Sequence, residues 1–254
     1  MRKKITAMLL CVLCTAGFSA CDTNNSTAAT TAETTVQTTE ATTKATVDES
    51  ALTWGEAKNF TPPEAGEKII VMKIKDRGEI KIKLFPEELP KACENFMGLT
   101  EMGYYDELIF HRIIHNFMNQ GGDPQGTGYG GQSMWGGYFD GGLSHNLYHF
   151  SGAVCYANSG STSADGSQFY IVNTEPGFMY TQKDISDYDY PQSVKDKYAE
   201  VGGTPFLDGG YTVFGQVIEG MDIVRDMGSV ETDSNDKPLT QVLIESVRIE
   251  EYQP

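Results

Sequence analysis

Basic residues are scarce in this sequence. The chain has 19 Lys and Arg residues against 35 Asp and Glu residues, which gives a formal net charge of −16. Binding to nucleic acid depends on clusters of Lys and Arg that neutralise phosphates, so the composition excludes a nucleic-acid partner. Solubility is a sufficient explanation of the acidic balance.

Cysteine is also rare in the part of the chain that can fold. Three of the five cysteines lie within the first 21 residues, which leaves Cys93 and Cys155. Two cysteines in a domain of this size do not form a disulfide framework. Cys93 lies in a helical pattern and Cys155 in a strand pattern, so both are predicted to be buried free thiols.

Metal-binding motifs are missing as well. The four histidines form two pairs with i,i+4 spacing, His111 with His115 and His145 with His149. On a helix this spacing suits zinc, but the metalloprotease pattern needs Glu after the first histidine, where Arg112 stands. Both pairs lie in strand or loop patterns, in which residues four apart are separated by about 13 Å. No calcium loop of the EF-hand type is present. We therefore expect neither a metal nor any other cofactor.

The sequence has no apolar run that is long enough to cross a membrane. Residues 5–18 are largely apolar and follow basic residues at positions 2–4, but a spanning helix needs about 20 apolar residues. A basic start before a short apolar run is typical of a signal peptide. The next residues, Phe-Ser-Ala-Cys at 18–21, resemble a bacterial lipobox. This predicts residues 1–20 as signal peptide and Cys21 as a lipidated first residue that anchors the chain to the outside of the cell membrane; simple secretion is the alternative.

The segment after Cys21 lacks apolar periodicity. Of the 29 residues from 22 to 50, 11 are threonine, and most others are Ala, Ser, Glu or Asn. Such a segment cannot bury enough surface to offset its ordering entropy. We predict a disordered Thr/Ala-rich tether over residues 21–64, followed by a folded domain over residues 65–254.

The folded part has a β-rich and turn-rich pattern. Residues 68–75 and 80–85 flank a turn, and the second of these alternates apolar and charged side chains, which predicts a hairpin. Further strands are predicted at residues 108–114, 152–157, 168–172, 211–217 and 242–249. Helices are predicted at residues 90–102, 191–200 and 221–227. The glycine-rich residues 121–142 predict a loop. These patterns fit a barrel or a sandwich equally well.

Three segments carry candidate chemistry. The first, FHRIIHNFMNQGGD at residues 110–123, combines one arginine and one amide with large apolar side chains. The second is Ala157-Asn158 followed by GSQFYI at residues 166–171, and the third is FLDGGYTVFG at residues 206–215. In this order, and within residues 67–249, they resemble the cyclophilins, the peptidyl-prolyl cis-trans isomerases. The resemblance implies a mainly β fold, a closed eight-stranded antiparallel barrel capped by two helices.

The resemblance also implies roles for individual residues. Arg112 matches the catalytic arginine, and Gln120 matches the glutamine that orients it. The matches to the substrate-binding groove are Phe117, Met118, Ala157, Asn158, Gln168, Tyr170, Phe206, Leu207 and Tyr211. Three of them depart from the usual residue: Tyr170 stands where phenylalanine is common, Phe206 where tryptophan is, and Tyr211 where histidine is. We expect the last two changes to weaken cyclosporin binding.

The expected protein is a monomeric isomerase of X–Pro bonds in proline-containing polypeptides outside the cytoplasmic membrane, where it assists their folding. Two alternatives stay open: a non-catalytic peptide-binding module on the same fold, and a chaperone for which isomerisation is secondary. Residues 174–204 form an insertion relative to minimal members of the family and include Tyr180, Tyr188, Tyr190 and Tyr198. We expect this insertion to be a solvated surface element; the alternative is that it borders the groove and biases substrate choice.

Overall fold

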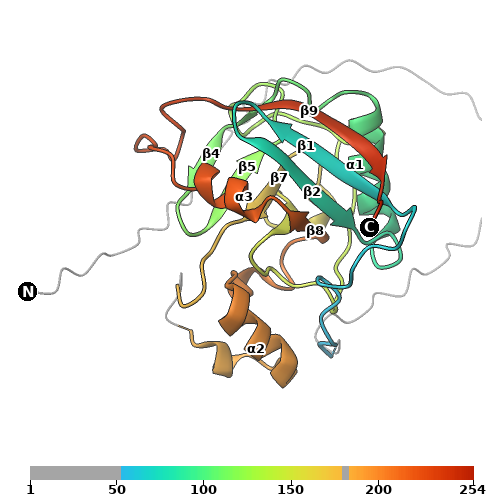
Figure 1. Cartoon of the computed structure of the whole chain (residues 1–254), viewed down its shortest axis with the longest axis vertical. Coiled ribbons are helices and arrows are strands. Elements are labelled where there is room, and N and C mark those ends of the chain that lie inside the picture. The colour runs from blue at the N-terminus through green and yellow to red at the C-terminus, as the bar shows by residue number, and fades with distance from the viewer. Residues whose placement is uncertain (1–52, 179–182) are drawn as a thin grey trace, which may run out of the picture. The chain divides into compact units, whose positions relative to one another are not determined.

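The computed structural model describes residues 53–178 and 183–254. Within these residues the chain forms nine strands and three α-helices (Figure 1). In chain order they are β1 (Lys68–Ile74), β2 (Gly78–Leu84), α1 (Pro90–Glu101), β3 (Ile109–Phe110), β4 (Arg112–Ile114), β5 (Met118–Gly121), β6 (Ala153–Tyr156), β7 (Phe169–Val172), α2 (Gln192–Val201), β8 (Val213–Glu219), α3 (Met221–Met227) and β9 (Val242–Glu251). Short 3-10 turns are η2 (Thr162–Ala164), η3 (Ile185–Asp187) and η4 (Pro205–Leu207).

The strands form a nearly closed antiparallel barrel. Their order is β3-β9-β1-β2-β8-β6-β7-β5-β4. The two ends of this order, β3 and β4, are separated in the chain only by His111. Because the end strands are almost continuous, the sheet curls back on itself and protects its edges. The predicted mainly β barrel is therefore confirmed.

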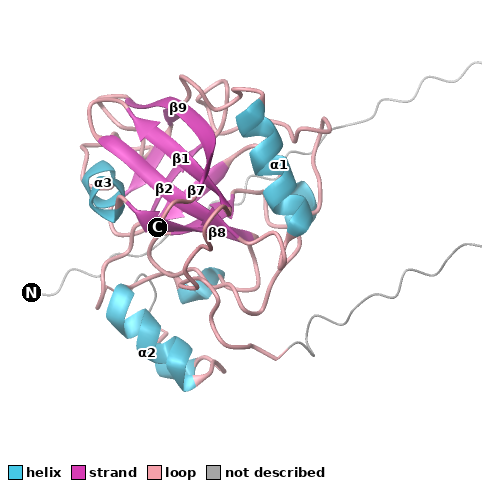
Figure 2. Ribbon diagram, turned by 45° about the vertical axis from the view of Figure 1, so that its right-hand side comes forward, coloured by secondary structure: helices cyan, strands magenta, loops and turns pink. Residues whose placement is uncertain are grey.

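The strand and helix counts differ from the expected eight and two. The predicted strand at residues 108–114 is split, because β3 pairs with β9 while β4 pairs with β5. The backbone N–H of His111, at the point of the split, donates to the carbonyl of Gln120 at 3.0 Å. The third helix, α2, belongs to the insertion at residues 174–204. Figure 2 shows α1 and α3 on opposite sides of the strands, with α2 standing apart below them.

Apolar periodicity explains how α1 joins the core. The helix begins at Pro90, where the missing N–H of proline costs no intrahelical hydrogen bond. Its buried face includes Ala92, Phe96 and Leu99, as the 3.6-residue spacing predicts. Phe96 packs edge-to-face against Phe169 of β7 at 5.4 Å between ring centroids. The helix thus covers one side of the barrel interior.

The two cysteines of the domain are free and fully buried, as predicted. Burial raises the pKa of the Cys93 thiol to about 12 and holds that of Cys155 well above its usual value. Both thiols therefore act as small apolar side chains at neutral pH. None of the helices among residues 53–178 and 183–254 has the length and apolar character that crossing a membrane requires.

The last part of the predicted tether packs onto the barrel. Trp54 lies 5.2 Å from both Tyr148 and Tyr190 between ring centroids. The fully buried side chain of Asn59 donates to the Tyr148 carbonyl and to Gln216 Oε1, each at 3.0 Å. The packed segment therefore extends upstream of residue 64. Cys21 and residues 21–52 of the tether lie outside the described residues, and so does Tyr180.

The expectation that the insertion is solvated holds for one face of α2 but is wrong for the other. Val194 is completely buried, and Tyr190 and Tyr198 are only 8% and 6% exposed. Together with Tyr148 and Phe150 they form a second apolar cluster, separate from the barrel interior. Tyr190 and Tyr198 are therefore used for packing and not for contact with solvent.

Candidate active site

A groove of about 200 Å³ lies over strands β4, β5 and β7, and most of the predicted site residues line it. Its walls are formed by Arg112, Phe117, Met118, Gln120, Ala157, Asn158, Tyr170, Leu207 and Tyr211. Two predicted residues lie beside it. Phe206 stacks on Phe117 at 5.9 Å between ring centroids, and Gln168 lines an adjoining hollow of about 360 Å³ together with Gln120 and Asn158.

Strand register explains why Arg112, Gln120 and Tyr170 meet. Arg112 of β4 lies opposite Gln120 of β5, which in turn lies opposite Tyr170 of β7. Directly opposed residues on neighbouring antiparallel strands project from the same face of the sheet. The eight-residue interval between Arg112 and Gln120 is a β4–β5 hairpin whose turn includes Asn116 with φ of 55°. The spacing seen in the sequence therefore becomes a row of side chains across three strands.

Arg112 is held from one side by an ion pair. Its Nε donates to Asp236 Oδ2 at 3.3 Å, and the two side chains are 44% and 40% exposed. Asp236 lies in the loop before β9, with φ of 64°, and its carbonyl accepts from Ile113 N at 2.8 Å. The pair uses Nε and not the two terminal nitrogens of the guanidinium, which remain possible donors to a substrate.

A chain of amide hydrogen bonds supports the neighbouring hollow. Gln120 Nε2 donates to Gln168 Oε1 at 3.0 Å. Gln168 Nε2 donates to the carbonyls of Gly128 and Gly130 at 3.0 and 2.8 Å. In the described structure the side chain of Gln120 is thus oriented by Gln168, while that of Arg112 is oriented by Asp236. The two predicted catalytic side chains are positioned by different partners.

Asn158, at the edge of the groove, is oriented by a buried carboxyl group. Its Nδ2 donates to Asp165 Oδ1 at 2.8 Å, and Thr212 Oγ1 lies 2.7 Å from Asp165 Oδ2. The Asp165 side chain is fully buried, and this burial raises the pKa of Asp165 to about 6 although both neighbours hydrogen-bond to it. Asp165 therefore orients a residue of the groove, and its carboxyl group changes protonation state near pH 6.

The hydroxyl of Tyr170 points away from the groove. It lies 2.9 Å from Nε2 of His149, whose side chain is fully buried. Burial raises the pKa of Tyr170 well above its usual value. The ring of Tyr170, which is 5% exposed, therefore faces the groove while its polar end is held inside the protein.

Comparison with known proteins identifies the family. The model of the family described as cyclophilin type peptidyl-prolyl cis-trans isomerase/CLD matches residues 69–249. The chain belongs to this family. It is accordingly an enzyme of the cyclophilin type, a peptidyl-prolyl cis-trans isomerase, and the isomerase prediction is confirmed.

Relatives from staphylococci resemble this cyclophilin over nearly their whole length. A Staphylococcus aureus protein named "Putative peptidyl-prolyl cis-trans isomerase" is 44% identical over 190 residues, which cover 74% of this chain and 94% of the relative. A Staphylococcus epidermidis protein of the same name is 43% identical over 178 residues, or 69% and 89% of the two chains.

Solved structures resemble this cyclophilin as well. A crystal structure of a Cryptosporidium parvum cyclophilin type peptidyl-prolyl cis-trans isomerase has a TM-score of 0.60 at 30% identity and covers 73% of this chain and 99% of its own. A second crystal structure of that protein, obtained in the presence of the dipeptide Ala-Pro, has a TM-score of 0.58 at 30% identity, with 72% and 99% of the chains covered.

Sequence reasoning missed three residues that support the groove of this cyclophilin. Asp236 and Asp165 contact Arg112 and Asn158, but both lie in loops whose turn chemistry alone explains an aspartate. His149 attracted notice only as half of a histidine pair. Neither its burial nor its contact with Tyr170 has a local signal, because the residues are brought together by the pairing of distant strands.

Proposed function

We propose that Arg112 is the catalytic residue of this isomerase and that the groove binds the proline of an X–Pro bond in polypeptide clients. The observation that carries the proposal is the row of Arg112, Gln120 and Tyr170 across three strands, beside apolar walls. The Ala-Pro dipeptide used with the Cryptosporidium parvum protein supports a proline-containing substrate.

Amide resonance sets the task of the catalyst. Twisting an X–Pro bond meets a barrier of about 18–20 kcal/mol, and uncatalysed exchange takes tens to hundreds of seconds. In the twisted state the prolyl nitrogen becomes pyramidal and regains its lone pair. A guanidinium N–H that reaches this nitrogen binds the twisted state better than the planar state, which lowers the barrier. The rotation itself requires no proton transfer and no covalent intermediate.

The first experiment compares Arg112→Ala with wild type in an NMR exchange assay on a short X–Pro peptide. Loss of one charged donor to a transition state costs about 100-fold or more in rate, so we expect a fall of this size in kcat/KM. Arg112→Lys, which keeps the charge but loses the planar fork, should lie between them. Arg77→Ala in the β1–β2 turn is the matched control and should keep full activity. Retention of activity in Arg112→Ala would contradict the assignment.

We propose further that the enzyme works outside the cytoplasmic membrane, assists the folding of its clients and is anchored through a lipidated Cys21. The basic start, the short apolar run and the lipobox-like residues 18–21 support this location. Expression of the full chain in a bacterium, followed by membrane fractionation, tests it. Wild type should enter the membrane fraction and Cys21→Ser should not, while Cys14→Ser is the matched control. Equal distribution of all three proteins would favour simple secretion.

A further inference from the structure

A buried polar chain runs from the groove wall into the protein. It starts at the Tyr170 hydroxyl, 2.9 Å from His149 Nε2. On the other side of the imidazole, Nδ1 lies 2.7 Å from Asp208 Oδ1, which also accepts from the His149 backbone N–H at 2.8 Å. The side chains of His149 and Asp208 are both fully buried. A buried imidazole–carboxylate pair thus lies behind the part of the groove wall that Tyr170 forms.

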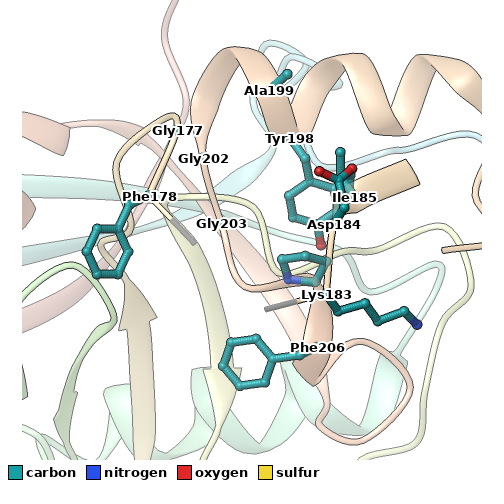
Figure 3. Close-up of a pocket in the computed structure, with 11 residues that line it drawn as sticks. Gly177, Phe178, Lys183, Asp184, Ile185, Tyr198, Ala199, Gly202, Gly203 and Phe206 are labelled. Carbon is teal, nitrogen blue, oxygen red and sulfur yellow. The ribbon is translucent and has the colours of Figure 1, made fainter. Parts of the chain in front are cut away.

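The insertion supplies the remaining donors to this carboxylate. Asp208 Oδ2 accepts from the hydroxyls of Tyr190 and Tyr198 at 2.8 and 2.6 Å. Tyr198 belongs to α2, and Tyr190 lies just before that helix. Figure 3 shows Tyr198 extending from α2 with its hydroxyl toward the segment that carries Phe206; both residues line a hollow of about 240 Å³. In the described structure, two of the four hydrogen bonds to Asp208 come from the insertion.

The chemistry of the carboxylate determines the direction of its own hydrogen bonds. A carboxylate only accepts, so both tyrosines and His149 Nδ1 donate to Asp208. Burial and the nearby charge of Asp208 raise the pKa of Tyr198 well above its usual value, which keeps its hydrogen in place. Nδ1 thus faces Asp208, and Nε2 is the ring nitrogen that contacts the Tyr170 hydroxyl, at 2.9 Å. A continuous series of buried contacts therefore connects Tyr198 to the groove wall through Asp208 and His149.

Asp208 also fixes the opposite wall of the groove. It directly follows η4, the turn that carries Phe206 and Leu207. The Tyr190 hydroxyl also lies 3.2 Å from the carbonyl of Pro205 in the same turn, but Asp208 Oδ2 is the nearer acceptor of its single hydrogen, at 2.8 Å. A buried carboxylate without its donors would pay a large desolvation penalty, and the backbone around it would shift to find new partners. Such a shift would change the spacing between the Tyr170 wall and the η4 rim.

We propose that Tyr190 and Tyr198 of the insertion are positioning residues of the active site, which hold the Tyr170 wall and the η4 rim at the spacing of a proline ring through Asp208 and His149. This inference rests on the proposed binding of proline in the groove. It assigns the insertion a part in substrate binding. A purely packing role would need only the aromatic rings, and phenylalanine would serve it equally well.

The test is the double variant Tyr190→Phe/Tyr198→Phe, which removes both hydroxyls and keeps both rings. The groove walls contact the proline in the ground state and in the transition state alike, so their displacement raises KM and leaves kcat nearly unchanged. We expect KM for an X–Pro peptide to rise about fivefold to tenfold, with kcat within about twofold of wild type. The matched control is Tyr148→Phe, because Tyr148 lies in the same aromatic cluster but its hydroxyl donates to the Gly55 carbonyl. Its KM should stay within about twofold of wild type.

A double-mutant cycle separates positioning from general loss of stability. Tyr170→Phe cuts the chain at its groove end, so adding Tyr190→Phe/Tyr198→Phe to it should raise KM by less than about twofold more. Independent effects would instead multiply. Multiplication, or a KM equal to that of Tyr148→Phe, would overturn the proposal.

Two further measurements keep the test decisive. If the double variant is unfolded at the assay temperature, Tyr198→Phe alone retains the Tyr190 donor, and its KM should rise about twofold to threefold with the same non-additivity. A KM within the range of the control would overturn the proposal here too. Arg112→Ala separates the two levels of inference: if it stays active, the proposed site itself is wrong, whereas its collapse beside normal tyrosine variants would refute only the role of the insertion.

Discussion

Thr212 has a single hydroxyl hydrogen and two acceptors close to it. Its Oγ1 lies 2.7 Å from the carbonyl of Gly142 and 2.7 Å from Asp165 Oδ2. One hydrogen cannot serve both contacts. If Asp165 carries a proton on Oδ2, it donates to Thr212, and Thr212 then donates to Gly142, so every group is paired. The geometry therefore agrees with the effect of burial, which raises the pKa of Asp165 to about 6.

This raised pKa has a definite sign for stability. Asp165 has a usual pKa of 3.8 in the unfolded chain and about 6 in the folded protein. Between these values the folded protein keeps a proton that the unfolded chain releases, so stability falls as the pH rises from about 4 to about 6. Above pH 6 the folded protein bears the full free-energy cost of an ionised, buried Asp165. A difference of about 2 pKa units corresponds to about 3 kcal/mol.

Asp165→Asn reproduces the protonated acid without its titration. The amide can donate to Thr212 through Nδ2 and accept from Asn158 through Oδ1. At pH 8 we expect the variant to be more stable than wild type by up to about 3 kcal/mol, a rise in Tm of about 6–12 °C for a domain of this size. The advantage should shrink as the pH falls through 6 and vanish near pH 4.

Urea unfolding followed by circular dichroism at several pH values between 4.5 and 8 measures this difference. Asp76→Asn, an exposed aspartate in the β1–β2 turn, is the control and should show no comparable trend. A difference between Asp165→Asn and wild type that stays constant with pH would refute the reasoning. So would a variant that is less stable at pH 8, because the ionised Asp165 would then stabilise the folded protein more than a neutral amide does.

Two further predictions concern the arginine and the thiols. Asp236→Asn keeps the positive φ, which asparagine tolerates, but removes the charge that faces Arg112. Because exposed ion pairs contribute up to about 1 kcal/mol, kcat/KM in the NMR exchange assay should fall about twofold to fivefold. An unchanged kcat/KM would show that Asp236 does not position the guanidinium. Cys93 and Cys155 should resist alkylation at pH 8 in the native protein and react after unfolding in urea, as peptide mass spectrometry can show; rapid native labelling would contradict their burial.

Local patterns were sufficient to predict much of the fold. The hairpin of β1 and β2, with Ile70 opposite Ile82, follows from alternation around a turn. The burial of Phe96 and Leu99 follows from helical spacing. The split at His111 could not be predicted, because it depends on the pairing of β3 with β9, which lies about 130 residues further along the chain. Closure of the barrel thus depends on pairing between strands that are distant in the sequence. It was expected from the family resemblance and not from the local pattern.

The candidate site divides in the same way. Arg112 and Gln120 are brought together by a short hairpin, so their spacing in the sequence already carries their geometry. Gln168 lies in the second motif and was predicted to line the groove, but its contact with Gln120 was not predicted. Asp236, the partner of Arg112, lies in a turn whose local sequence does not distinguish it from an ordinary turn residue. The motifs therefore predict which side chains line the groove, while the contacts that hold those side chains require the structure.

Tyr170 shows how a departure from the family pattern acquires meaning. It stands where phenylalanine is common, and in the structure its additional hydroxyl lies behind the groove wall and pairs with His149. Phenylalanine at this position would leave the imidazole nitrogen buried without its hydrogen-bond partner, at a cost of about 1–3 kcal/mol. The carboxylate of Asp208 places the same demand on Tyr190 and Tyr198. Each buried polar group in this series needs a hydrogen-bond partner, and its neighbour in the series supplies one. Tyr170 in the groove and the tyrosines of the insertion therefore form one structural unit.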